Sequence, residues 1–379
     1  MKTAICTILA KNYVSFSRTL FASFQALHPG VPCYALIVDE WRGFLRQADE
    51  PFAIVSLDEL GIPDLKATTF KYDITELSTA AKPFLLDHLL RTQGIDKLLY
   101  LDPDILVTGD LSALFSALDS ADFIVTPHVD TDYPDDGHEP NDKFILLSGI
   151  YNLGFFGIRK SDNAFAFLDW WKHKLTTKCV IDHAIGYFVD QRFIDLAFGL
   201  FSGFTIIRDT GYNTAYWNVH SRAISRENQI WRSNNRPLYF FHFSGYNPLR
   251  PRKISKYLTR YTFEARPDLQ PIFAEYTAKV LAHNFDETSK WPYTFGKYEN
   301  GESIPYLDRQ YYREIQEKGA QPPLPFTSPV ELRRMAKRLR TSHPLSFRSA
   351  TLIYLGALRQ ILFPPKKHPS SEPAVDESR

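Results

Sequence analysis

Short, continuous apolar runs recur along the first two thirds of the chain, with helical patterns between them. Strands that are apolar at every position are typical of a sheet covered on both faces. Their alternation with helices predicts an α/β domain around a mostly parallel sheet. The predicted strands are Ala4–Leu9, Tyr34–Val38, Ala53–Leu57, Lys97–Leu101, Phe123–Thr126, Phe155–Ile158, Thr205–Ile207 and Leu238–Phe243. The predicted helices are roughly Ser15–Ala26, Glu76–Thr92, Leu111–Leu118 and Ala164–Leu175.

The pattern changes after about residue 250, where Pro-rich joints flank polar and helical segments such as Asp268–His283. We expect one main domain and a helical C-terminal appendage. The predicted divisions are a principal domain over 1–250, a mainly helical extension over 251–325, a basic amphipathic segment over 326–367 and a disordered tail over 368–379. The tail has no apolar side chains to bury, which is the reason for expecting disorder there.

Charge and cysteine content exclude several classes of protein. A formal net charge of +1 over 379 residues argues against a nucleic-acid-binding surface. Cys6, Cys33 and Cys179 are too few and too widely spaced for a disulfide framework or a zinc motif, which favours a reducing compartment. The N-terminus is interpreted as a first strand and not a signal peptide. No apolar run approaches the length of about 18 residues that suggests a transmembrane helix. We therefore expect a soluble or peripheral cytoplasmic protein.

The most informative segment is KLLYLDPDILVTGD, in which a buried strand leads directly into Asp102 and Asp104. Side chains two residues apart on an extended chain point to the same side, so both carboxylates can face one ion. Pro103 between them fixes the turn. Ligands of open α/β sheets bind at the carboxyl ends of strands, where this pair lies, and carboxylates suit Mg²⁺ or Mn²⁺ bound with substrate phosphate. The alternative is a solvated turn that caps the next helix, although Asp110 can do that unaided.

Six segments in order resemble the retaining glycosyltransferases of family 8, to which glycogenin and bacterial lipopolysaccharide galactosyltransferases belong. They are ILAKNYV, ELSTAAKP, YLDPDILV, YNLGFFGI, VDQRFIDLAF and FHFSGYNP, within residues 3 to 250. The resemblance implies a GT-A fold, which is Rossmann-like with a mostly parallel central sheet. It also implies a nucleotide-diphosphate sugar donor, commonly UDP-linked, a divalent metal and retention of anomeric configuration.

The resemblance assigns the metal to Asp102, Asp104 and His242. Imidazole suits Mn²⁺ better than Mg²⁺, so Mn²⁺ is the first choice and Mg²⁺ the second. On its own, His242 in the aromatic run YFFHFSG is more typical of a core histidine than of a metal ligand, and its place at a strand end before Gly245 favours the ligand.

The same resemblance supplies the other site residues. Lys82 is placed against the donor, where a cation can offset diphosphate charge. Asn152 and Gly154 line the sugar pocket, and Gly154 lets the backbone approach the ligand. Asp190 is implied to hold donor hydroxyls, and Gln191 to lie near the anomeric carbon. No nucleophilic carboxylate is evident of the kind that retaining glycosidases use, which favours a front-face mechanism. Lys82, Asp190 and Gln191 are thus the predicted catalytic residues.

The donor's base and ribose are expected to meet the residues after the first strand, Ala10, Asn12 and Tyr13, and Gly245 follows in His-x-x-Gly. One departure from the family pattern concerns the diphosphate. Many members follow His-x-x-Gly with a Lys-Pro, whereas Asn247 stands at that place here. Arg250, Arg252 and Lys253 are the candidates to replace that Lys, and Arg250 is the one chosen.

The polar and aromatic segment GYNTAYWNVHSR is the predicted contact for the acceptor, a saccharide or a lipid-linked sugar. Asn213 and Trp217 are its candidates, and aromatic packing under a loop is the alternative. Two other functions stay open. A phosphatase of the haloacid-dehalogenase type also uses Asp-x-Asp, but on the first strand of its core. A non-catalytic sugar-binding protein could use the same scaffold.

Residues 332–367 carry nine basic side chains and no acidic one, interleaved with apolar residues. This composition suits a helix on an anionic membrane surface, where each basic residue adds about 1 kcal/mol. The alternative is a helix packed on the rest of the chain, which is net acidic. Because glycolipids are assembled at membranes, we predict peripheral contact with the inner face of the membrane.

Overall fold

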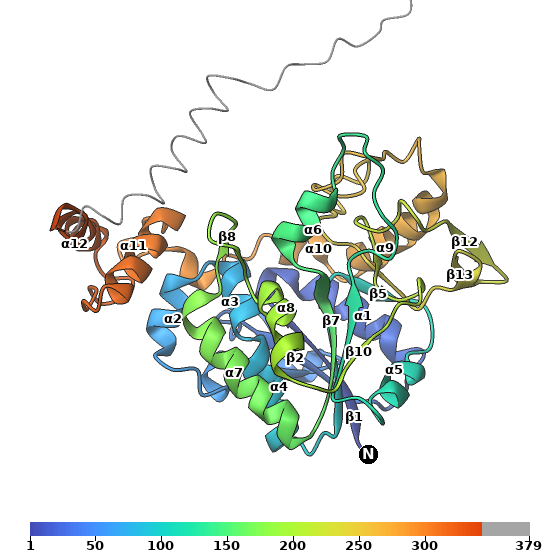
Figure 1. Ribbon diagram of the computed structural model, residues 1–379, viewed down its shortest axis with the longest axis horizontal. Helices are drawn as coiled ribbons and strands as arrows, with labels where there is room; N and C mark the ends of the chain where they lie inside the picture. The colour runs from blue at the N-terminus through green and yellow to red at the C-terminus, as the bar shows by residue number, and fades with distance from the viewer. Residues whose placement is uncertain (343–379) are drawn as a thin grey trace, which may run out of the picture.

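A seven-stranded sheet forms the centre of the molecule in the computed structural model, which describes residues 1–342 (Figure 1). Its strands, in spatial order, are β10 (Phe204–Ile206), β6 (Phe123–Pro127), β7 (Tyr151–Arg159), β4 (Lys97–Leu101), β1 (Thr3–Leu9), β2 (Cys33–Ile37) and β3 (Ala53–Ser56). Neighbours pair in parallel except that β7 runs antiparallel to both β4 and β6. The predicted α/β fold around a mostly parallel sheet is confirmed.

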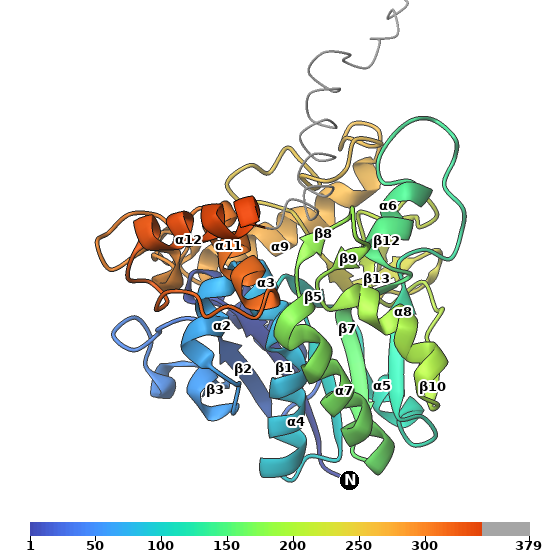
Figure 2. The same ribbon diagram turned by 60° about the vertical axis from the view of Figure 1, so that its left-hand side comes forward.

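Helices cover both faces of this sheet. Those on one face are α1 (Val14–Gln25) and α5 (Ser112–Ala117), and those on the other are α3 (Ile74–Ala80), α4 (Lys82–Thr92), α7 (Asp162–Lys178) and α8 (Gln191–Leu200). Figure 2 shows α4 and α7 in front of the sheet. Successive side chains of β1 point to opposite faces of the sheet. Ala4, Cys6 and Ile8 pack in the core with α4 and α7. Ile5 and Leu9 pack in the core under α1. This two-sided burial explains the continuous apolar sequence.

A small three-stranded sheet lies beside the carboxyl end of β4. It consists of β11 (Thr214–Ala215), β15 (Phe240–His242) and β5 (Ile105–Val107), in that order. β15 pairs antiparallel with β5, and His242 stands opposite Ile105. This register brings the end of β15 next to the turn between β4 and β5. The other short strands are β8 (Ile181–Asp182) with β9 (Tyr187–Phe188), and β12 (Ile224–Glu227), β13 (Ile230–Ser233) and β14 (Arg236–Pro237).

The helix predicted over Glu76–Thr92 is in fact two helices, α3 and α4, which meet at Ala81. Pro83 is the physical reason, because proline lacks an N–H and its ring clashes with the preceding turn, although it is tolerated in a first turn. The break makes Lys82 the first residue of α4. Helices α2 (Leu65–Lys71) and α6 (Asp142–Ser148) and α8 were not predicted. The first two have seven residues each, too few to show a clear helical period.

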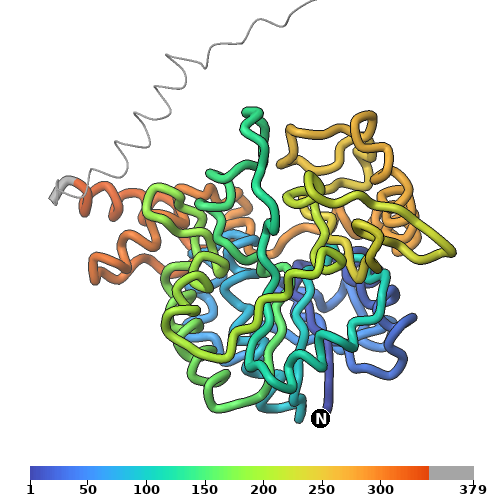
Figure 3. The backbone as a smooth tube through the Cα atoms, turned by 45° about the vertical axis from the view of Figure 1, so that its right-hand side comes forward, coloured from blue at the N-terminus to red at the C-terminus, as the bar shows by residue number. Residues whose placement is uncertain are grey.

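The predicted C-terminal helical part is present. It comprises α9 (Gln270–Ala282), α10 (Phe285–Thr288), α11 (Tyr306–Glu317) and α12 (Pro329–Ser342), and the short 3₁₀ turns of the chain are η1 (Lys11–Tyr13), η2 (Gln47–Asp49), η3 (Leu57–Glu59), η4 (Pro267–Leu269) and η5 (Thr294–Gly296). Phe273 and Tyr276 of α9 share a core with Phe16 of α1 and Leu106 of β5. Figure 3 shows the segment that contains α9, in gold, against the N-terminal part of the chain, in blue. The division at residue 250 stays a prediction.

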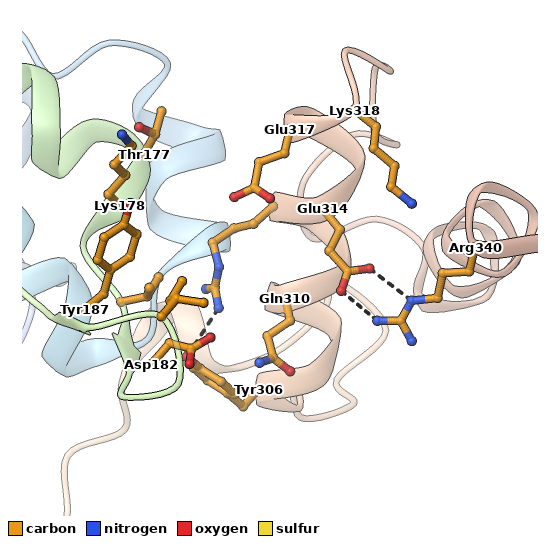
Figure 4. Close-up of a pocket in the computed structure, with 13 residues that line it drawn as sticks. Thr177, Lys178, Asp182, Tyr187, Tyr306, Gln310, Glu314, Glu317, Lys318 and Arg340 are labelled. Atoms are coloured by element: carbon orange, nitrogen blue, oxygen red, sulfur yellow. Dashed lines mark hydrogen bonds and ion pairs between the residues drawn. The ribbon is translucent and has the colours of Figure 1, made fainter. Parts of the chain in front are cut away.

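Helix α12 packs on α11 through both apolar and charged side chains. Leu332 and Ala336 are each 2% exposed. The guanidinium of Arg333 lies 2.7 Å from the carboxylate of Asp308. Arg340 and Glu314 form a second pair at 2.7 Å, drawn in Figure 4 beside the pocket between α11 and the β8–β9 hairpin.

In the part of the basic segment that the structure describes, the helix therefore packs on the rest of the chain, which was the alternative to membrane contact. Residues 343–367 and the predicted tail 368–379 lie outside the described residues. Within 1–342, no helix is long and apolar enough to cross a membrane.

Candidate metal centre

The acidic turn between β4 and β5 is held in place by its backbone. The N–H of Asp102 donates to the carbonyl of Gly154 in β7 at 2.8 Å, and the carbonyl of Asp104 accepts from the N–H of Phe243 at 2.9 Å. The turn is thereby fixed to the central sheet on one side and to the end of β15 on the other. The side chains of Asp102 and Asp104 remain 32% and 21% exposed, so both carboxylates can be reached by a ligand.

His242 completes a cluster of three ligand-type atoms. Its Nε2 lies 3.0 Å from Oδ1 of Asp104 and 3.7 Å from Oδ2 of Asp102. One ligand atom from each of the three residues lies within 4.8 Å of the others, which allows them to hold one metal ion. Two carboxylates and an imidazole form a donor set that fits Mn²⁺, and Mg²⁺ less well.

The electrostatics of His242 are set by these neighbours. Burial lowers the pKa of the imidazole, but the carboxylates of Asp104 and Asp102 outweigh burial and leave this pKa above its ordinary value. In the absence of a cation, the protonated ring is therefore more favoured than it is for an imidazole in water. A bound cation replaces that proton as the positive charge between the carboxylates.

Gly154 makes room for the imidazole. A Cβ at this position would lie 2.3 Å from Cε1 and 2.7 Å from Nδ1 of His242, and 2.8 Å from Oδ1 of Asn152. Distances below 3.0 Å require something to move. The sequence predicted that Gly154 lets the backbone approach a ligand. In the structure, the group that comes close to Gly154 is the imidazole of His242.

Polar side chains lie behind His242, away from the two carboxylates. Nδ1 of His242 lies 3.3 Å from Oδ1 of Asn213. Nδ2 of Asn213 donates to Oγ1 of Thr126 at 2.8 Å and to Oδ1 of Asn152 at 3.0 Å. Nδ2 of Asn152 lies 3.3 Å from Nε2 of His128. The four amide and imidazole side chains form a continuous buried chain of hydrogen bonds.

This arrangement corrects the prediction for the acceptor. Asn213 is fully buried and Trp217 is 2% exposed, so neither side chain offers a face to an acceptor. The ring of Trp217 stands edge-on to His242 at 5.1 Å between centroids. The packing alternative for this segment is the one that the structure supports.

A buried ion pair lies on the other side of Asp102. Nζ of Lys82 is 2.6 Å from Oδ2 of Asp190 and donates to the carbonyl of Leu153 at 2.9 Å. The ammonium also lies 4.3 Å from the ring centre of Tyr100, whose hydroxyl donates to Oδ1 of Asp102 at 2.6 Å. Burial raises the pKa of Asp190, and the ammonium of Lys82 partly offsets this rise.

Gln191 is held by the backbone. Its Oε1 accepts from the N–H of Leu153 at 3.0 Å, and its Nε2 donates to the carbonyl of Ser148 at 2.8 Å. It begins α8, directly after Asp190. The structure thus brings the predicted residues Lys82, Asp190 and Gln191 together around β7.

A pocket of about 400 Å³ opens beside the acidic turn, and Asp104 forms part of its wall. Three of the predicted donor residues line it: Asn12, Tyr13 and Gly245. The others do not: Ala10, Lys82, Asn152, Gly154 and Arg250. Ala10 is buried ahead of η1, and Arg250 lies on the exposed surface. The basic residue in the wall is Lys256, and the other lining residues are Phe16, Thr75, Ser244, Tyr246, Asn247, Pro248, Tyr257, Phe285 and Ser289.

Comparison with known proteins gives weak matches. No protein-family model matches the chain. Two uncharacterized proteins of Bacillus subtilis (strain 168) are similar in sequence. YfnF is 26% identical over 290 residues, covering 75% of this chain and 94% of YfnF. YfnD is 22% identical over 257 residues, covering 66% of this chain and 79% of YfnD.

Among solved structures, the glycosyltransferase GlyE of Streptococcus pneumoniae TIGR4 has a TM-score of 0.43 at 16% identity, covering 79% of this chain and 67% of GlyE. The galactosyltransferase LgtC, in complex with donor and acceptor sugar analogs, has a TM-score of 0.41 at 16% identity, covering 73% of this chain and 95% of LgtC. At this level of similarity these proteins carry no activity over to this chain.

Three residues near the cluster were missed from the sequence. Tyr100 could have been found, because it lies on β4 two residues before Asp102, which follows that strand directly, and so faces the same side. Lys256 follows the basic residues considered for the diphosphate by only a few positions. Nothing in the sequence around His128 indicates that it belongs to the site, since a single histidine after a strand is common in cores.

Proposed function

We propose that this chain is a metal-dependent retaining glycosyltransferase of the family 8 type. It moves a hexose from a nucleotide-diphosphate sugar, UDP-linked in our proposal, to a saccharide or glycolipid acceptor. One observation carries the proposal: Asp102, Asp104 and His242 converge at the carboxyl end of β4, and Asp104 also lines a pocket of about 400 Å³. A metal-type cluster beside a pocket at this edge of an α/β sheet is the arrangement that a phosphate-bearing ligand requires.

The pocket walls support a nucleotide-sugar as the ligand. Its volume lies in the range of about 300–1,000 Å³ typical of small-molecule sites. Oδ1 of Asn12 is buried and has no hydrogen-bond partner within residues 1–342, so it can accept from an N–H of a base. The ring of Tyr13 offers a surface for stacking. We assign the diphosphate contact to Lys256 in place of Arg250, because only Lys256 lines the pocket.

The residues around Asp190 support retention without a covalent intermediate. In the proposed reaction the bond between the anomeric carbon and the diphosphate oxygen breaks. The acceptor hydroxyl oxygen bonds to the same face, and its proton passes to the departing diphosphate. A nucleophilic carboxylate would have to be free, whereas Asp190 is buried and paired with Lys82.

Stabilisation of the leaving group is then the main catalytic task. When bound, a divalent cation supplies positive charge to the departing diphosphate. Lys256 adds a second positive charge, and the Lys82–Asp190 pair and Gln191 order the sugar side of the site.

Two alternatives are less well supported. A haloacid-dehalogenase phosphatase places its Asp-x-Asp after the first strand, whereas Asp102 follows β4. A non-catalytic sugar-binding protein does not require a buried His242 aimed at two carboxylates. The cluster of three ligand-type residues therefore favours an enzyme.

The test is a screen of purified protein against nucleotide-sugars for Mn²⁺-dependent release of nucleotide diphosphate. The matched control is Asp104→Asn, which keeps the shape of the side chain and removes its charge. We expect release by the wild type with at least one donor and none by this variant, with unchanged thermal unfolding. Near-normal turnover by Asp104→Asn in Mn²⁺ would contradict the metal assignment. NMR of the product decides stereochemistry, and an inverted anomer would contradict retention.

A further inference from the structure

Backbone N–H groups, which can only donate, fix the orientation of the side-chain amides of Asn152 and Asn213 behind His242. The N–H of Gly154 donates at 3.0 Å to the side chain of Asn152, so the atom facing it is the oxygen. On the other side, the Asn152 amide faces Oε1 of Gln191 at 3.4 Å. That Oε1 accepts from the N–H of Leu153, so the Asn152 atom facing it is the nitrogen. Two independent contacts thus give Asn152 the same orientation.

The next side chain inherits its orientation from Asn152. Oδ1 of Asn152 accepts only, so the Asn213 atom that meets it at 3.0 Å is Nδ2. The remaining atom, Oδ1 of Asn213, faces Nδ1 of His242 at 3.3 Å. Because an amide oxygen has no hydrogen to give, Nδ1 of His242 must carry the proton. When a cation takes the place of hydrogen on Nε2, which faces Asp104 and Asp102, the ring keeps its remaining hydrogen on Nδ1.

The far end of the chain agrees with this direction. Nδ1 of His128 lies 2.8 Å from the carbonyl of Gly149, so it donates. Burial lowers the pKa of His128 to about 4, which keeps the ring neutral and leaves its Nε2 to accept from Asn152. Every donor along the chain therefore points away from the carboxylates, from His242 towards Gly149.

We propose that Asn213 is a positioning residue, which accepts the Nδ1–H of His242 and so directs the Nε2 lone pair at the metal site. The inference rests on the proposed metal site. A ring with its proton on Nε2 could not bind a cation between the two carboxylates. Partners of this kind behind a metal-binding histidine affect metal affinity by about 10–100-fold.

The backbone at Asn213 guides the choice of variants. Its φ is 51°, in the left-handed region that Gly, Asn and Asp adopt most readily. Asn213→Gly removes the acceptor, and Asn213→Asp keeps the acceptor but loses the amide that donates to Thr126 and Asn152. Neither variant adds backbone strain.

The experiment measures Mn²⁺ affinity of the full chain by electron paramagnetic resonance of free Mn²⁺. We expect Asn213→Gly to weaken binding about 10–100-fold and Asn213→Asp, which keeps the acceptor, to weaken it less. In a His242→Gln background, which has no Nδ1–H, Asn213→Gly should change affinity by less than about twofold. Equal losses in both Asn213 variants, or an equal loss with and without His242, would overturn the proposal, because either indicates a purely structural role.

A spectroscopic readout separates failure of this inference from failure of the metal site. Nitrogen-15 NMR of histidine in the metal-free protein should show an Nδ1–H of His242 that is hydrogen-bonded and protected from exchange with water, with His242→Gln assigning the signal. Asn213→Gly should lose that protection. A wild type that binds no Mn²⁺ would sink the proposed metal site, and the Nδ1–H signal would still decide the role of Asn213. A wild type without a protected Nδ1–H would overturn that role.

Discussion

Gly154 and His242 stand so close that the glycine has no room for a side chain: a Cβ would lie 2.3 Å from Cε1 of the ring. Gly154→Ala should therefore push the imidazole away from Asp104. We expect about tenfold weaker Mn²⁺ binding or more, and a loss of stability of about 1–3 kcal/mol from overpacking. Calorimetric titration with Mn²⁺ and thermal unfolding measure the two effects.

Gly199→Ala is the matched control. Position 199 is exposed on α8, and a Cβ there meets nothing within 4 Å. This change should leave metal binding intact and stabilise the helix by about 0.4–1 kcal/mol. If Gly154→Ala bound Mn²⁺ as well as this control does, His242 would not be a ligand.

Metal binding should depend on pH through His242. The pKa of this ring lies above its ordinary value of 6.5, because Asp104 and Asp102 outweigh burial. A ligand nitrogen must lose its proton, so Mn²⁺ affinity should fall as pH decreases, starting above pH 6.5. Titrations of Mn²⁺ across pH, with His242→Gln as the control that lacks this titration, measure the effect. An identical pH profile in both proteins would contradict the assignment.

The same group has the opposite effect on the metal-free fold. Because the pKa of His242 is raised in the folded state, folding favours the protonated ring. This contribution to stability is fully present below the ordinary value of 6.5 and is lost as pH rises through the raised folded value. Urea unfolding of metal-free wild type and His242→Gln over this range should show the difference.

Loss of either partner of the Lys82–Asp190 pair should destabilise the protein. Both side chains are 3% exposed, so Lys82→Met leaves an uncompensated buried carboxylate. We expect a cost of about 3–5 kcal/mol in urea unfolding, together with loss of transfer. Lys82→Met/Asp190→Asn removes the stranded charge and should recover part of that stability. A double variant no more stable than Lys82→Met would argue against a charge effect.

Removal of α12 should destabilise the protein. Leu332 and Ala336 are buried against α11, so a chain ending at residue 328 exposes the apolar surface that they cover. We expect its thermal midpoint to fall, by an amount similar to that of Leu332→Ala, which should cost about 2–5 kcal/mol. A chain ending at residue 342 is the control, because it keeps the whole of α12.

The predicted membrane contact of residues 332–367 is tested with the same two chains. If it is real, the full chain should sediment with anionic vesicles, the chain ending at residue 342 should not, and salt should weaken the attachment. A full chain that ignores such vesicles at low salt would exclude peripheral contact through this segment.

The sequence predicted well those features that depend on local pattern. β4 has the predicted bounds, Lys97–Leu101, because a fully buried strand is apolar throughout. Asp102 and Asp104 both face His242 as predicted, although Pro103 and Asp104 form a turn and not the expected extended chain. The helix break at Lys82 was missed, although Pro83 signals it.

Features that depend on distant parts of the chain could not be predicted in this way. Asn213 was expected to face an acceptor because its segment is both polar and aromatic, as in sites that bind sugars. It is buried because Thr126, Asn152 and His242 satisfy its hydrogen-bonding groups. Lys256, rather than Arg250, lines the pocket because of the path of a loop that has no regular pattern.

The pairing of β15 with β5 also has a consequence for folding. Asp102 and Asp104 are neighbours along the chain, whereas His242 joins them only when its strand docks opposite Ile105. Closing so long a loop costs more entropy than forming a local turn, and contacts between distant segments slow folding. A cation added during refolding therefore meets two donors early and the third only when the late strand arrives. The gain in Mn²⁺ affinity over time should mark the completion of folding and not its onset.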